Sequence, residues 1–392
     1  MMERDGGKFE IGVNYWPIRK GMALWRSFDP GEVREDFARM RDWDISPARI
    51  FLLWEDFQPE PDRVGMPALN RLVELAGIAS DAGIPICVTL FTGHMSGANW
   101  LPGWMVLPGE SESRFPVITR GRSGPFNVRN PYLEREVRDA QKILIRETCA
   151  ALRGYAGLWG WDLGNEPSNV YRPNERGQGR TWIGEMTEEL LRLNPAPVTI
   201  GLHQEDIEQN RGMDPEDAAQ FCDLITMHAY PAYSSWSGGK TDPLFPLFMA
   251  EMARWLSGRS EVWMAEMGVS TGSDAKSVSE EEAAVYAGDS LDILRRAGIP
   301  GALWWCYGDY SRDVCGAVPF RDLPHECCFG LVRSDGSPKE TLDVIRRAER
   351  TRIARRPDLD WINVEPREYR DEPEMHIRRL YRRFRELNSS EP

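Results

Sequence analysis

The sequence lacks any long apolar run. No stretch of 18 or more apolar residues occurs in it, so no segment is predicted to span a bilayer. The opening letters MMERDGGKFE also lack the basic flank and apolar stretch of a secretory signal. We therefore expect a cytoplasmic protein with no membrane partner.

Positive charge is in deficit. The chain has 48 Lys and Arg residues against 61 Asp and Glu residues, a formal net charge of −13. Nucleic acids and anionic membrane surfaces attract basic proteins, so neither is an expected partner. The expected partner is a small molecule that is not strongly anionic, and assembly into a homo-oligomer stays open.

Cysteine is scarce, with seven residues and therefore an odd count. This number fits buried thiols in a reducing compartment better than a disulfide framework. Cys327 and Cys328 are adjacent, and we interpret them as two free thiols near a loop, although a reactive role stays open. Four others lie in apparent strands and helices: Cys87, Cys149, Cys222 and Cys306.

Short apolar, β-branched or aromatic runs alternate with amphipathic stretches along the chain. Such alternation predicts parallel strands joined by crossover helices. Helix start signals stand between the runs at Asp29-Pro30, Pro67 and Ser279, and Gly298 suits a helix C-terminus. The eight candidate strands are residues 9–16, 47–54, 84–93, 157–165, 196–202, 223–230, 261–268 and 301–308.

Eight strands with matching helices predict an α/β fold, a single (β/α)8 (TIM) barrel with long βα loops. We expect the barrel at residues 1–356, since such barrels commonly exceed 250 residues as one unit. Its closing helix would be 341–356. Residues 357–392 would form a C-terminal helical tail packed on the barrel, with an oligomerisation arm as the alternative. Segments 94–131 and 309–340 are too long for simple connectors and would decorate the face that carries chemistry.

Polar and aromatic side chains stand at the predicted C-terminal ends of the strands, where barrel active sites lie. Glu166 and Glu266 lie 100 residues apart, about three βα units at roughly 30 residues each, so they would face each other across the barrel. Hydrolysis of a glycosidic bond with retention needs two carboxyl groups at ~5 Å separation. The full set is Arg49, His94, Asn165, Glu166, His228, Tyr230, Glu266, Trp304 and Trp305.

The two carboxyl groups must titrate differently for this chemistry. Arg49 and Tyr230 near Glu266 would favour its ionised form. Glu166, in an apolar and aromatic surrounding, would keep its proton near neutral pH. A lone glutamate after a strand is more often a structural or solvated group, but the number of matching positions favours a catalytic acid and a nucleophile.

The strand ends carry the motifs GNEP, HAYP, AEMG and WWCYGDY. Together with Arg49 and His94, they resemble glycoside hydrolase family 5, a group of retaining β-glycosidase barrels, over roughly residues 9–356. The resemblance implies these roles: Glu166 as acid/base, Glu266 as nucleophile, Asn165 as donor to the sugar 2-hydroxyl, Tyr230 and Arg49 orienting Glu266, His228 lining the site, His94 contacting sugar hydroxyls or bracing a loop, and Trp305 stacking under the glycone.

Strand alternation sends only one of Trp304 and Trp305 into the barrel. Trp305 is the predicted sugar platform because its WCYGD context resembles the mannan-active branch of the family. Further indoles could stack additional pyranose rings, and we expect about half of them to be core instead. These are Trp16, Trp54, Trp100, Trp104 and Trp161.

The stretch LLWEDFQPEP also resembles mannosidase-type members, which implies a β-mannoside substrate. A cytoplasmic enzyme meets imported oligosaccharides rather than polymers, which favours exo action. An endo-β-1,4-mannanase or a β-glucanase is the alternative, and a catalytically inactive sugar-binding barrel is the alternative that is not an enzyme. The last would normally lack one carboxylate, and both are present.

A metal-dependent hydrolase on the same barrel would need an HxH pair of metal ligands after the first strand. The letters GVNYWP supply no such pair. His203 with Glu205, and His325 with Glu326 and Cys327, are interpreted as local coincidences. We therefore predict no metal and no cofactor.

Overall fold

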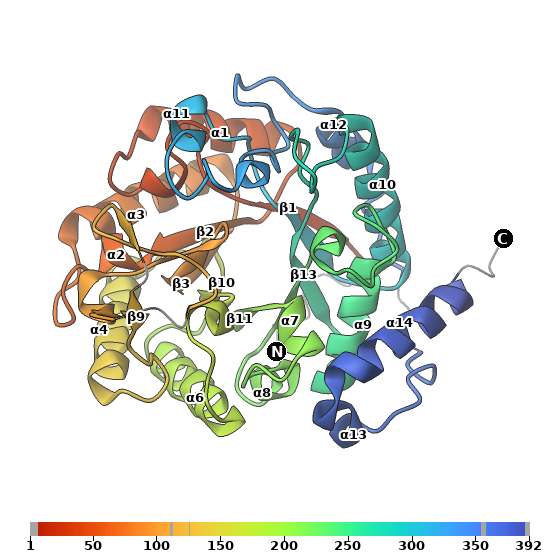
Figure 1. Ribbon diagram of the computed structural model, residues 1–392. Helices are drawn as coiled ribbons and strands as arrows, with labels where there is room; N and C mark the ends of the chain where they lie inside the picture. Colours follow the sequence, from red (N-terminus) through yellow and green to blue (C-terminus); the bar gives the residue numbers. More distant parts are fainter. Residues whose placement is uncertain (1–6, 110–112, 125, 354–357, 389–392) are drawn as a thin grey trace.

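The computed structural model describes residues 7–109, 113–124, 126–353 and 358–388. Eight parallel strands close into a barrel (Figure 1). All eight predicted strands are confirmed, and the fold is a (β/α)8 barrel. In the order in which they neighbour one another, the strands are β1 (Glu10–Asn14), β14 (Gly301–Trp304), β13 (Val262–Met267), β12 (Ile225–Ala229), β11 (Val198–His203), β10 (Leu158–Asn165), β3 (Ile86–Thr92) and β2 (Ala48–Leu53).

Helices surround the barrel, and each strand is followed by one of them (Figure 1). Two predicted start signals act as caps: Asp29 accepts hydrogen bonds from the first turn of its helix, and Ser279 forms a capping box with Glu282. In chain order the main helices are α1 (Pro30–Asp42), α3 (Met66–Ala82), α4 (Arg135–Ala151), α6 (Arg176–Leu193), α8 (Pro215–Ala219), α9 (Phe245–Ser257), α10 (Glu280–Arg296) and α12 (Glu340–Arg347).

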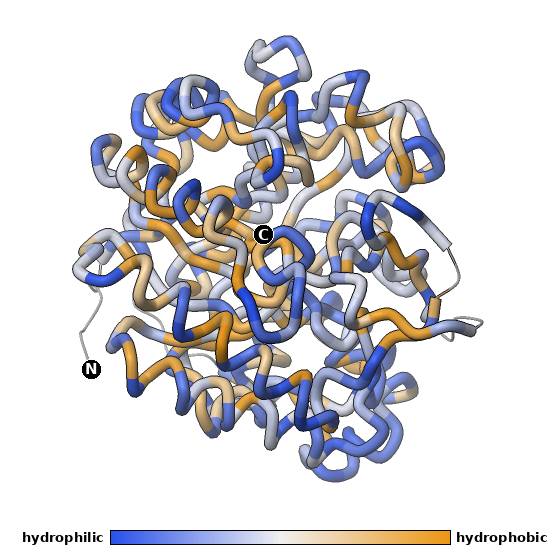
Figure 2. Tube along the Cα trace, turned by 90° about the vertical axis from the view of Figure 1, so that its left-hand side faces the viewer, coloured by the Kyte–Doolittle hydropathy of each residue, from blue (hydrophilic) through white to orange (hydrophobic). Residues whose placement is uncertain are grey.

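The outer helices are amphipathic. Hydrophilic and hydrophobic residues alternate along them in Figure 2, so that one side of each helix can pack on the barrel. Across the part of the chain that the structure describes, no helix is both long enough and apolar enough to cross a membrane.

The predicted closing helix, residues 341–356, is wrong in its length, because α12 ends at Arg347. The chain beyond it bonds to the N-terminal segment instead: the Phe9 N–H donates to the Arg350 carbonyl oxygen at 2.6 Å. That pairing uses the backbone groups that another helical turn would need. Residues 354–356 of the prediction lie outside the described residues.

The C-terminal tail forms α13 (Pro366–Asp371) and α14 (Pro373–Asn388), which lie beside α9 (Figure 1). The hydroxyl of Tyr369 donates to the main-chain oxygen of Ile207 at 2.8 Å. Aromatic side chains of the tail pack around Phe248 of α9: Trp361, Tyr381 and Phe384. The apolar side of the tail is thus covered by the outer helix layer.

The segments after β3 and β14 carry small elements that the alternation of apolar runs did not predict. Short α-helices also follow directly after three other strands. After β3 come β4 (His94–Met95), β5 (Ala98–Trp100), β7 (Val117–Thr119) and β8 (Arg122–Gly124) in one sheet, and β6 (Val106–Leu107) with β9 (Asn127–Val128) in another. The short α-helices after the three other strands are α2 (Trp54–Phe57), α5 (Pro167–Val170) and α7 (Gln204–Glu208). The segment after β14 carries α11 (Arg312–Cys315) and the 3-10 helix η4 (Pro324–Cys327).

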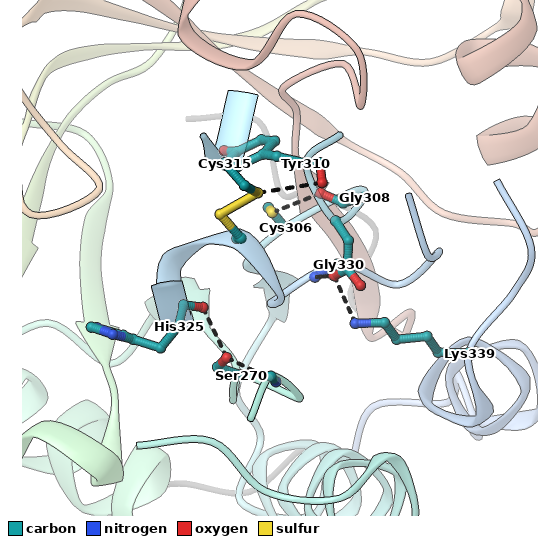
Figure 3. Close-up of a disulfide and its surroundings, with 11 residues drawn as sticks. Ser270, Cys306, Gly308, Tyr310, Cys315, His325, Gly330 and Lys339 are labelled. Atoms are coloured by element: carbon teal, nitrogen blue, oxygen red, sulfur yellow. Dashed lines mark hydrogen bonds and ion pairs between the residues drawn. A yellow bond between two sulfur atoms is a disulfide. The ribbon is translucent and has the colours of Figure 1, made fainter. Parts of the chain in front are cut away.

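The prediction of free thiols is wrong for one pair of cysteines. Cys315 of α11 and Cys327 of η4 form a disulfide (Figure 3). Only the folding of the segment after β14 brings them together, so their spacing carried no signal. Cys328 is free and half-buried. The four predicted buried thiols are free and buried: Cys87, Cys149, Cys222 and Cys306.

Candidate active site

The predicted strand-end residues gather around one cavity. Its volume is about 560 Å³, within the usual range of small-molecule sites, about 300–1,000 Å³. Arg49 and His228 do not line it but lie buried among the residues that do. The predicted residues in the lining are His94, Asn165, Glu166, Tyr230, Glu266 and Trp305.

The two carboxyl groups lie close together. A Glu166 oxygen, a Glu266 oxygen and a ring nitrogen of His228 all lie within 4.8 Å of one another. The strand register contributes to this short distance, since His228 on β12 is the direct neighbour of Glu266 on β13. This separation is close to the roughly 5–5.5 Å of retaining glycosidases and below the roughly 6.5–9.5 Å of inverting ones.

A sharp turn presents Glu166 to the cavity. Its backbone is left-handed, with φ 46°, and this conformation ends β10 and starts α5. Pro167 follows at the first helical position, where a missing N–H costs nothing. The Glu-Pro pair is therefore the local reason that the carboxyl group leaves the strand at this point.

Arg49 connects the residues inside the barrel. Its guanidinium donates to Glu266 Oε1 at 2.6 Å, to Asp162 Oδ2 at 2.7 Å and to Asn165 Oδ1 at 3.0 Å. The guanidinium needs a glycine beside it, since a Cβ at position 201 would lie 2.7 Å from its Nη2 atom. Sequence reasoning missed Asp162, although an acidic residue inside an apolar strand was an available signal.

Glu266 has a charged and a neutral partner. Besides the Arg49 contact at Oε1, the Tyr230 hydroxyl donates to Oε2 at 2.6 Å. Burial raises the pKa of Glu266, while His228, Arg49 and the Tyr230 hydroxyl act in the opposite direction. The structure thus brings both predicted orienting residues onto this carboxylate.

Glu166 has only uncharged donors in contact with it. The Asn169 amide donates to Oε2 at 2.9 Å, and His228 Nδ1 lies 2.9 Å from Oε1. The predicted apolar and aromatic surrounding is therefore wrong, because loop residues supply polar groups that strand alternation did not reveal. Burial nevertheless raises the pKa of Glu166.

The two histidines predicted for the site, His94 and His228, favour their neutral forms. Burial lowers the pKa of His228 to about 4 and also lowers that of His94. A neutral His228 can contact the carboxylate at 2.9 Å as a donor only if Nδ1 carries the hydrogen. Asn99 uses its amide nitrogen on the Asn169 carbonyl, so its oxygen faces His94 Nδ1 at 2.8 Å. His94 Nε2 is then an acceptor, 3.7 Å from Glu166 Oε2.

The adjacent tryptophans point to opposite sides of the barrel. Trp305 lines the cavity and meets Phe51 of β2 edge-on, with ring centroids 5.9 Å apart. Trp304 packs towards Tyr286 of α10, at 6.2 Å, and its indole N–H donates to the Phe329 carbonyl. Only Trp305 can therefore lie under a bound sugar ring.

None of the five further tryptophans lines the cavity within the described ranges, so the expectation that about half would stack sugars there is wrong. Trp16 shows the reason: it stacks on Phe51 and is fully buried in the core. Aromatic side chains from loops line the cavity instead, and sequence reasoning missed them. They are Phe115, Tyr233 and Phe329.

Only one group of three described side chains could offer closely spaced metal ligands, namely Glu166, His228 and Glu266. Both oxygens of Glu266 already accept hydrogen bonds. The permanent positive charge of Arg49 lies against the same carboxylate and disfavours a second cation. The donor set is therefore better suited to proton and group transfer than to holding a metal.

Comparison with known proteins gives no match to any protein-family model and none to any curated protein. Solved structures do match. A GH5_18 protein from Streptomyces cattleya in complex with GlcNAc has a TM-score of 0.72 and 22% identity, over 87% of this chain and 80% of that chain.

A Glu-to-Ala variant of GH5_18 from the same organism, in complex with Manβ1-4GlcNAc, has a TM-score of 0.77 and 21% identity, over 97% of this chain and 92% of that chain. The exo-β-1,4-mannosidase of Opitutaceae bacterium strain TAV5 has a TM-score of 0.73 and 24% identity, over 88% of this chain and 61% of that chain. At these identities the likeness shows the shared barrel fold.

Proposed function

We propose that this protein is a retaining β-glycoside hydrolase of the family 5 type, with Glu166 as acid/base and Glu266 as nucleophile. The observation that carries the proposal is the pair of carboxyl groups with oxygens within 4.8 Å of each other, of which only Glu266 is in contact with the Arg49 guanidinium. The fold shared with GH5_18 proteins and with an exo-β-1,4-mannosidase supports it.

The reaction takes two steps. Glu266 attacks the anomeric carbon as Glu166 protonates the leaving oxygen, the glycosidic bond breaks, and a glycosyl ester forms on Glu266. Glu166, now ionised, then takes a proton from water as that water attacks the same carbon, which releases the sugar and restores both groups. Asn165 donates one amide hydrogen to the His94 main chain, and its other hydrogen would serve the sugar 2-hydroxyl.

We further propose exo action, in which two loops that meet would close one end of the cavity. None of the described residues in the loops after β1 and β2 lines it. Above those strands the loop after β3 meets the loop after β14, and a Cβ at Gly97 would lie 2.6 Å from the Leu323 side chain. A single glycone unit would therefore bind beyond the cleaved bond, which leaves an endo-mannanase or β-glucanase as the alternative.

The proposed substrate is a β-linked manno-oligosaccharide. Its support is the motif resemblance together with the solved structures, since one holds Manβ1-4GlcNAc and another is named an exo-β-1,4-mannosidase. Nitrophenyl β-glycosides of mannose, glucose, galactose, fucose and xylose test the glycone. With manno-oligosaccharides we expect release of one mannose at a time, and cleavage confined to internal bonds would contradict exo action.

Glu166→Ala separates an enzyme from an inactive sugar-binding barrel. We expect hydrolysis of natural glycosides to fall about 10²- to 10⁴-fold, because the leaving oxygen loses its proton donor. Glycosides with activated leaving groups need no proton and should retain much of the rate of the first step. A wild-type protein that binds sugars but turns over none of these glycosides would instead be a binding protein.

A further inference from the structure

One wall of the cavity is polar and has no part in the two reaction steps. It comes from the segment after β14, where η4 brings His325 and Glu326 into the lining. Tyr233 and Lys276, from the loops after β12 and β13, complete this wall. The same cavity is therefore lined by further carboxylates besides Glu166 and Glu266, and Glu326 is the one in this wall.

Glu326 is buried and held by neighbouring side chains. The Tyr233 hydroxyl donates to its Oε1 at 2.8 Å, and His325 Nε2 lies 3.4 Å from the same oxygen. Asp274 holds the other side of the His325 ring, with Oδ2 3.1 Å from Nδ1. A carboxylate offers about four lone-pair sites, so two contacts on one oxygen leave acceptor capacity for groups in the cavity.

The segment that carries Glu326 is anchored on several sides. The disulfide of Cys327, the next residue, ties η4 to α11. Ser270 Oγ donates to the His325 main-chain oxygen at 2.8 Å (Figure 3). A carboxylate fixed in this way loses little conformational freedom when a ligand binds.

We assign Glu326 to the glycone side of the site from its place in the chain. It belongs to the same connection as Trp305, the proposed platform under the glycone, whereas Glu205 follows β11 and is one of the charges that raise the pKa of Glu166, the proposed acid. Tyr230, which contacts the nucleophile, packs against Tyr233 with ring centroids 5.6 Å apart. Tyr233 thus connects Tyr230 to Glu326, which places Glu326 further from the reacting carbon than Tyr230 is.

We propose that Glu326 determines glycone specificity by accepting hydrogen bonds from two neighbouring hydroxyl groups of the sugar, remote from its anomeric carbon. Tyr233 and His325 position the carboxylate for this contact. The ligand class is an uncharged pyranose at a non-reducing end, since a glycone with its own carboxylate would be repelled. The inference rests on the proposed glycosidase function.

The test compares Glu326→Gln and Glu326→Ala with wild type on nitrophenyl β-mannoside and on its 3-, 4- and 6-deoxy analogues. We expect kcat/KM for the parent glycoside to fall about 10- to 100-fold in Glu326→Ala, because hydrogen bonds to a charged group are lost. The fall should be much smaller for the analogue that lacks a contacted hydroxyl. Tyr233→Phe should give a weaker version of the same pattern.

Glu281→Gln, an exposed glutamate on α10, is the matched control and should match wild type. Wild-type kcat/KM in both Glu326 variants would overturn the inference, as would equal losses on the parent and all deoxy analogues. Should Glu326→Ala fail to fold, Glu326→Gln and Tyr233→Phe carry the same comparison. A wild-type protein inactive on every β-glycoside would overturn the proposed function itself.

Discussion

Glu266 and Glu166 face each other across one cavity but belong to different layers of the molecule. Glu266 sits in the strand layer, where the Arg49 guanidinium contacts one oxygen and Tyr230 the other. Glu166 sits at a strand-to-helix turn, where Asn169 and His228 are its hydrogen-bonding partners. Burial raises the pKa of both groups.

The difference lies in the charge of the contacts. A permanent cation in contact with a carboxylate favours its ionised form, as a nucleophile requires. Neutral donors stabilise the anion less, so a buried carboxyl group among them can hold a proton, as an acid requires. Rigid strands supply the charged contact, and the chain after the β10 turn supplies a neutral one.

The largest expected effect comes from removing the strand-layer carboxylate. Glu266→Ala should lower kcat by about 10⁴-fold or more for every β-glycoside, because no covalent intermediate can form. Activated leaving groups should give no relief, in contrast to Glu166→Ala. Added azide should restore turnover with an α-glycosyl azide as product, identified by NMR. A β-glycosyl azide from this variant would exchange the two proposed roles.

Arg49→Met tests the charged contact itself. It leaves Asp162 buried without its ion-pair partner, so the free energy of unfolding should fall by about 3–5 kcal/mol in urea titration. Without the guanidinium the pKa of Glu266 rises further, and activity is lost as pH falls through that pKa. The acidic limb of the pH–rate profile should therefore move to higher pH.

Arg49→Lys is the control for this experiment. Lysine keeps the positive charge but lacks the planar guanidinium that donates to several acceptors at once. The acidic limb of Arg49→Lys should therefore lie between those of wild type and Arg49→Met, while the free energy of unfolding should stay low. An acidic limb that stays in place in Arg49→Met would show that the cation does not set the ionisation of Glu266.

The smallest effect is expected on the turn side. Asn169→Ala removes a donor that stabilises the Glu166 carboxylate, so the pKa of Glu166 should rise. The acid must be protonated, and activity falls as pH rises through its pKa, so the basic limb should move to higher pH. For poor leaving groups kcat should fall about tenfold, in line with one lost hydrogen bond to a charged group.

Activated leaving groups should show little change in kcat with Asn169→Ala. Asn70→Ala, at an exposed position of α3, is the matched control and should leave the profile unchanged. An equal loss for all leaving groups would indicate that Asn169 supports the fold of the loop rather than the acid.

Much of the fold was predictable because its signals are local. Each barrel strand is a short apolar run with its own boundaries, and Asp29 and Ser279 cap helices through neighbours three residues away or nearer. The residues at the strand ends could be found in the same way, since parallel strands of a barrel open at one face. The end of α12 was not predicted, because the backbone beyond this helix forms its hydrogen bond with the distant N-terminal segment instead of with another helical turn.

The partners of the candidate site were not predictable from local patterns. Asp162 reaches Arg49 across 113 positions of the chain. Glu326 meets Tyr233 across 93 positions, through loops whose paths no periodicity describes. The disulfide partner of Cys327 is closer in the chain, yet it too depends on how the loop after β14 folds.

The amino-acid sequence by itself determined the eight strands, their order, and which side chains stand at their ends, because short apolar runs and helix caps are signals that act over a few residues. Only the tertiary structure decided that Asp162 shares the Arg49 cation, which tryptophans are core, and which wall of the cavity is polar. Those outcomes depend on the mutual position of distant segments. Burial and charge are properties of that arrangement and not of any one segment.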